Sequence, residues 1–210
     1  MTFRLWLATV AALICGSQAD AQNKVRTETI RPSVTANPAG KPNAHATPSD
    51  AHNAAGVPDI VTDLSQLPAP VARTRERILA AAQSGDLQKL LTIMQMNETM
   101  PIFSFSDEKD PVAFWKNSYP DSEGIEVLSI LVTLLQTGYV HVDKGTPQEM
   151  YLWPYFTRMP VKNLTPEQKV ELFRIITGND YKDMLDFGAY IFYRVGIGPD
   201  GTWHFFVAGN

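Results

Sequence analysis

Residues 189–208 read AYIFYRVGIGPDGTWHFFVA, and two strands that close the fold can be recognised in them. Two runs rich in aromatic and β-branched residues flank a short turn, a pattern typical of a β-hairpin. Pro199 presets one backbone angle of the turn, Asp200 can accept from backbone N–H groups ahead of it, and Gly201 adopts a left-handed conformation at little cost. The stretch therefore predicts two antiparallel strands at the C-terminus.

The turn segment GIGPDG, residues 196–201, also satisfies the pattern G-x-G-x-x-G of dinucleotide-binding proteins. In those proteins the glycines lie between a strand and a helix, because the helix N-terminus holds the pyrophosphate. Here the glycines lie between two strands. We therefore expect no nucleotide at this turn, and the sequence predicts no cofactor elsewhere.

The turn also sets a pairing register for the two strands. If Ile197 pairs with Trp203 and side chains alternate regularly along both strands, one face of the hairpin is apolar and packs on the core. This face consists of Ile191, Tyr193, Val195, Trp203 and Phe205. The opposite face then carries Tyr190, Phe192, Arg194, His204 and Phe206. One explanation of these residues is that a helix covers the face and that the side chain of Arg194 extends to water. The alternative is a ligand-binding surface, because arginine and aromatic rings suit carboxylates and sugars.

The residues before the hairpin predict intermixed helices and strands. Residues 71–95 indicate two helices separated at Gly85, the first with an apolar edge and the second capped by Asp86. Asp110 caps a further predicted helix, and others are indicated at 124–138, 165–176 and 180–187. The helix at 165–176 has a capping box of Thr165 and Gln168 and a stop at Gly178. A strand pair is indicated at 139–143 and 150–156. No regular strand–helix–strand alternation is present, so the class is α+β. We expect an N-terminal αα-hairpin and several further helices packed on a small, mostly antiparallel sheet that ends in the C-terminal β-hairpin.

The N-terminal third differs in composition from the rest. Arg4, an apolar run at 5–15 and the triplet Ala19-Asp20-Ala21 predict a signal peptide over residues 1–21, cleaved near Ala21. Residues 22–70 contain seven prolines and no aromatic residue, which predicts a disordered tether. Residues 71–210 form the single predicted domain, and we expect it in the periplasm or secreted.

Composition excludes several classes of partner. The formal net charge is −4, whereas a nucleic-acid-binding protein would present a basic face. The apolar run at 5–15 is shorter than the roughly 20 residues that a membrane-spanning helix needs, so we expect no membrane span. The chain has one cysteine, Cys15, which signal-peptide cleavage would remove together with any thiol chemistry.

His141 and Asp143 are the candidate catalytic residues. They stand two apart in a predicted strand, so their side chains should point to the same side. Such a pair could serve a hydrolase, and His204 could complete a metal triad with it. No zinc motif and no serine in a nucleophile elbow accompany the pair, so we predict no metal site, and a polar strand end explains these residues without any chemistry.

Tyr151, Trp153 and Tyr155 form a further candidate ligand-binding set. A two-residue period would place the three rings on one face of a strand, where they could stack on sugar rings. The alternative is a row of half-buried aromatic residues, with Pro154 marking an edge strand.

Three stretches carry a resemblance to a known family: the C-terminal hairpin, DPVAFW at 110–115 and YLWPYF at 151–156. Through them, residues 73–210 resemble a family of uncharacterised exported proteins of alphaproteobacteria. The resemblance implies an envelope location and carries no known activity or catalytic residue. We therefore predict a non-enzymatic module that binds an envelope protein or a glycan through an aromatic-rich surface. The alternative is a cell-envelope hydrolase with His141 and Asp143 in its site.

Overall fold

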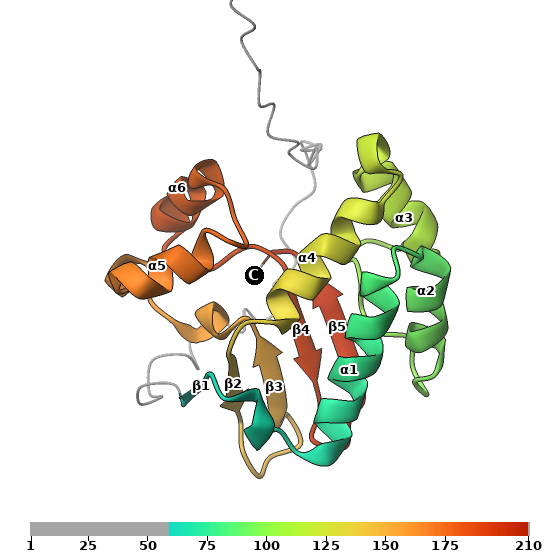
Figure 1. The fold of residues 1–210 in the computed structure, drawn as a ribbon, viewed down its shortest axis with the longest axis horizontal. Helices are drawn as coiled ribbons and strands as arrows, with labels where there is room; N and C mark the ends of the chain where they lie inside the picture. The colour runs from blue at the N-terminus through green and yellow to red at the C-terminus, as the bar shows by residue number, and fades with distance from the viewer. Residues whose placement is uncertain (1–58, 210) are drawn as a thin grey trace, which may run out of the picture. The chain divides into compact units, whose positions relative to one another are not determined.

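The structure is a computed structural model that describes residues 59–209 (Figure 1). The predicted signal peptide at 1–21 and residues 22–58 of the predicted tether lie outside the described residues. In the described part, six α-helices accompany a five-stranded antiparallel sheet. The α+β prediction is confirmed at this level.

The strands follow one another across the sheet in chain order, β1-β2-β3-β4-β5, and each is antiparallel to its neighbour. Their bounds are Ile60–Val61 for β1, Tyr139–Val142 for β2, Met150–Trp153 for β3, Arg194–Ile197 for β4 and Trp203–Val207 for β5. Helices α1 to α4 connect β1 to β2, and α5 and α6 connect β3 to β4. In Figure 1, α1, α2 and α3 lie at one side and α5 and α6 at the other, with α4 between them.

The first group of helices comprises α1 (Ala69–Gln83), α2 (Leu87–Gln95), α3 (Pro111–Ser118) and α4 (Ile125–Leu135). Two aspartates begin helices here as local chemistry predicts: the side chain of Asp86 accepts from the N–H of Gln88, and that of Asp110 accepts from Val112 and Ala113. This layer and one face of the sheet enclose a core that includes the fully buried Trp115, Trp153 and Trp203.

The second group comprises α5 (Pro166–Leu172) and α6 (Gly178–Phe187), preceded by the 3-10 turns η3 (Tyr155–Arg158) and η4 (Val161–Asn163). The predicted capping box of Thr165 and Gln168 is present at the start of α5. The helix was expected to continue to Ile176, with Gly178 as its stop. Instead α5 ends at Leu172, and Gly178 is the first residue of α6, because Thr177 and Asp180 form a second capping box.

The domain begins before the predicted boundary at residue 71. Ile60 and Val61 pair with Val140 and Tyr139, and Leu67 is buried in the core of the first layer. The backbone at Val61 lies close to Gly138, since a Cβ at Gly138 would be 2.9 Å from the carbonyl oxygen of Val61. The predicted tether is therefore wrong over residues 59–70. The sequence did not reveal this strand, because two residues in a proline-rich, polar context show no periodicity.

The register predicted for the C-terminal hairpin is correct only at the turn. Ile197 pairs with Trp203 as expected, but the remaining pairs are Gly196 with Phe205, Val195 with Phe206 and Arg194 with Val207. His204 is the additional residue of a β-bulge, which shifts every later partner by one. The predicted pairing of Val195 with Phe205 is therefore wrong.

The bulge exchanges the faces of two phenylalanines. Phe206, predicted on the outer face, is fully buried in the first-layer core, whereas Phe205 packs against the second-layer core. The ring of Phe205 covers Gly196 so closely that a Cβ at this glycine would overlap it. Both faces of the hairpin are consequently packed against protein.

None of the helices within residues 59–209 is long and apolar enough to cross a membrane.

Candidate functional site

The predicted aromatic ligand set is interior. Tyr151, Trp153 and Tyr155 are 5%, 0% and 2% exposed, respectively. The first two pack in the first-layer core, but Tyr155 packs in the second-layer core, because β3 ends at Trp153 and η3 begins at Tyr155. The prediction that the three rings share one face is wrong, and the rings are not available for stacking on a sugar.

The other predicted ligand-binding residues of the hairpin are mostly covered as well. Tyr190 is buried and its hydroxyl donates to the carbonyl oxygen of Tyr193 at 2.8 Å. Phe192 and Arg194 are half-buried. Burial lowers the pKa of Arg194, and the nearby positive charge of Arg158 lowers it further. Of the residues predicted on this face, only His204 is exposed, so little of the face is open to a ligand.

His141 is held by a carboxylate, but not by the predicted one. Its Nε2 lies 2.7 Å from Oε1 of Glu149, and its ring stacks on Tyr151 with 4.1 Å between centroids. The other oxygen of Glu149 accepts from the N–H of Gly145 at 2.8 Å. This N–H and His141 together hold the pKa of Glu149 below its usual range.

Asp143 lies beyond the end of β2, which stops at Val142. Its backbone is left-handed, with φ at 53°. Strand alternation therefore ends before Asp143, and the residue joins the loop that returns to β3. Strand geometry therefore no longer places the Asp143 side chain beside His141, whose carboxylate partner is Glu149.

The metal triad that the sequence allowed is not assembled. His141 is on β2 and the exposed His204 is on β5, with β3 and β4 between them. At about 4.8 Å per strand, this places their strands roughly 14 Å apart. Within residues 59–209, no group of three or more His, Cys, Asp or Glu side chains is arranged to hold a metal ion.

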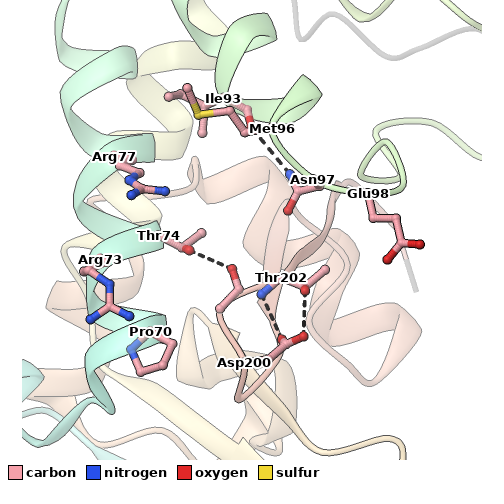
Figure 2. A pocket seen from close by; sticks show the side chains of 11 residues that line it. Pro70, Arg73, Thr74, Arg77, Ile93, Met96, Asn97, Glu98, Asp200 and Thr202 are labelled. Atoms are coloured by element: carbon pink, nitrogen blue, oxygen red, sulfur yellow. Dashed lines mark hydrogen bonds between the residues drawn. The ribbon is translucent and has the colours of Figure 1, made fainter.

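A cavity of about 330 Å³ lies elsewhere, between α1, the C-terminal end of α2 and the β4–β5 turn (Figure 2). Thr74 of α1 closes one side by donating its hydroxyl to the carbonyl oxygen of Gly201 at 2.6 Å. Gly201 has φ at 91°, and a Cβ on it would lie 2.8 Å from the carbonyl oxygen of Pro70. Only glycine lets the turn approach α1 this closely.

Asn97 fixes the other side of the cavity. Its Nδ2 donates to the carbonyl oxygen of Met94 at 3.0 Å, and its Oδ1 accepts from the backbone N–H of Trp203 at 3.0 Å. The end of α2 and the start of β5 are thereby joined through one side chain. The cavity walls are thus rigid elements tied together by hydrogen bonds.

The two walls carry opposite charges. Arg73 and Arg77 stand one helical turn apart on α1, and Figure 2 shows Asp200 and Glu98 on the opposite side. The carboxylate of Asp200 accepts from the N–H and the hydroxyl of Thr202, at 2.9 and 2.8 Å, which lowers its pKa. Within the described part of the chain, no ion pair joins these arginines to these acids.

Sequence reasoning did not find this site. It identified Asp200 and Gly201 only as turn residues, and it used α1 only for its apolar edge. The available signal was the pair Arg73 and Arg77, which share one exposed face of a helix. Nothing local to that helix indicates that the turn of a distant hairpin lies opposite.

In comparisons with known proteins, no family model matches the chain, no curated protein is significantly similar to it and no solved structure is significantly similar to it.

Proposed function

We propose that this protein is an exported cell-envelope protein that works as a binding module, and that its ligand occupies the cavity between α1 and the β4–β5 turn. The signal-like N-terminus and the resemblance to exported proteins support the location. The cavity between rigid, oppositely charged walls is the observation that carries the binding role. The ligand is a small molecule, or a group presented by an envelope protein or a glycan.

The chemistry of the cavity favours binding over catalysis. The Thr74 hydroxyl is engaged with Gly201, and both ends of the Asn97 amide are engaged with backbone groups. The charged groups that remain are arginines and carboxylates, which orient polar ligands. A volume of about 330 Å³ is at the small end of the range for ligand sites.

NMR spectroscopy of the isotope-labelled full chain would test this proposal. Mixtures of amino acids, short peptides, organic acids and sugars should include a ligand that shifts the amides of Gly201, Thr202 and Met96. Met96 is 64% exposed at the cavity, so Met96→Trp should obstruct binding. Met100, 37% exposed and outside the cavity lining, gives the matched control Met100→Trp. Ligand-induced shifts confined to other surfaces would refute the cavity as the site.

The bond between His141 and Glu149 favours a second candidate function, a cell-envelope hydrolase. A carboxylate that orients an imidazole is the arrangement of a general base and its positioning group. His141 would then activate water or a hydroxyl, with Glu149 in the role that the sequence had assigned to Asp143. Neither residue lines the cavity of Figure 2.

Hydrolysis of p-nitrophenyl acetate would test the second candidate. His141→Gln and Glu149→Gln should both abolish the reaction, and Asp143→Asn should retain it, because Asp143 does not bond to His141 in the structure. Equal rates in all three variants and the unmodified chain would eliminate the hydrolase.

A further inference from the structure

We infer that the ligand of this cavity is dipolar, with a carboxylate for Arg73 and Arg77 and an ammonium group for Asp200, as in an amino acid or a short peptide. The inference rests on the proposed function and specifies its ligand class.

The arginine side of the cavity is assigned by the orientation of α1. Three arginines follow at alternate positions, but Nε of Arg75 donates to the carbonyl oxygen of Leu135 at 2.8 Å, at the C-terminal end of α4. Arg73 and Arg77 project from the other side of the helix, are exposed and line the cavity (Figure 2). Guanidinium groups present fixed N–H donors that match the two oxygens of a carboxylate.

The acidic side is preorganised. Each oxygen of Asp200 already accepts one hydrogen bond from Thr202, which fixes the plane of the carboxylate and keeps it ionised. A carboxylate oxygen can accept more than one hydrogen bond, so both oxygens retain capacity for an ammonium group. Glu98 adds a second negative charge to this part of the lining.

The opposition of charges distinguishes a dipolar ligand from a simple ion. A lone anion near the arginines would be repelled by Asp200 and Glu98, and a lone cation near Asp200 would be repelled by the arginines. A ligand with both charges is attracted at both ends, which gives affinity and excludes ligands with one charge. The cavity volume of about 330 Å³ suits an amino acid or a dipeptide better than a longer chain.

Calorimetric titration of the full chain with alanyl-alanine would test this inference. N-acetyl-alanyl-alanine lacks the ammonium group, and alanyl-alanine amide lacks the carboxylate. Each blocked form should bind roughly tenfold more weakly, the loss expected for one charge-assisted contact. Arg77→Gln should weaken the discrimination against the amide, because only Arg73 remains for the carboxylate. Asp200→Asn should weaken the discrimination against the acetylated form, because only Glu98 remains for the ammonium group. Arg75→Gln is the matched control on the same helix and should retain both preferences.

The outcomes separate this inference from the proposed function. Equal binding of all three dipeptides would overturn the dipolar ligand but not the binding site. The same conclusion would follow if only a sugar or an organic acid shifted the amides of Gly201 and Thr202. No cavity shift with any compound of the screen would overturn both. The blocked dipeptides need no variant, so the test does not depend on whether Asp200→Asn folds.

Discussion

The strands and the turn of the C-terminal hairpin differ in what surrounds them. Trp203 and Phe206 are fully buried beneath the helical layer, whereas Asp200 and Thr202, only a few residues away, line an open cavity. Trp203 lies at the boundary, since its ring is in the core and its backbone N–H bonds to Asn97 at the cavity wall. Neighbouring positions therefore separate into those that are buried in the core and those that face the cavity.

Trp203→Ala should have the largest effect on stability. Truncation of a fully buried tryptophan removes about 3–5 kcal/mol from the free energy of unfolding, through lost burial and the cavity left behind. Chemical denaturation would measure the loss. His204→Ala, on the next residue, is the matched control: its exposed side chain should contribute within about 0.5 kcal/mol. Similar losses in both variants would show that burial of the Trp203 ring does not determine the effect.

Asn97→Ala should have an intermediate effect. The backbone N–H of Trp203 would lose its partner, and an unsatisfied buried donor costs about 1–3 kcal/mol. Asn97→Asp retains an acceptor for that N–H, so it should recover part of the stability in the same denaturation experiment. An aspartate no better than alanine would show that the bond to Trp203 contributes little.

Arg75→Gln and Arg77→Gln should differ although they lie on one helix. Arg75 is half-buried and bonds to the last carbonyl of α4, so its loss should cost about 1 kcal/mol. Arg77 is exposed and its loss should leave the melting temperature nearly unchanged. A lower melting temperature for Arg77→Gln than for Arg75→Gln would reverse the roles assigned to them.

The smallest effect concerns pH and the loop between β2 and β3, which contains Glu149. Because the folded state holds the pKa of Glu149 below its usual range, the carboxylate stabilises the fold at pH values above about 4.3, the ordinary value for glutamate. This contribution is lost as pH falls through the folded pKa. The melting temperature of the unmodified chain should therefore exceed that of Glu149→Gln at pH 7, and the difference should shrink towards pH 3. A difference independent of pH would show that the charge plays no part.

Local chemistry was sufficient to predict several elements. The capping aspartates Asp86 and Asp110, the box at Thr165 and the left-handed Gly201 are all where the sequence placed them. Each depends on groups within a few residues along the chain, whose relative positions the backbone itself restricts. The α+β class follows from the same kind of local pattern.

Long-range packing set the features that the sequence did not reveal. The bulge at His204 depends on how Phe205 and Phe206 fit two different cores, and the choice of Glu149 over Asp143 depends on where β2 ends against β3. The cavity requires Thr74 to meet Gly201, which is 127 positions further along the chain. Side-chain alternation and residue spacing describe one element at a time. They carry no information about contacts between distant elements, because those contacts form only when the elements pack against one another.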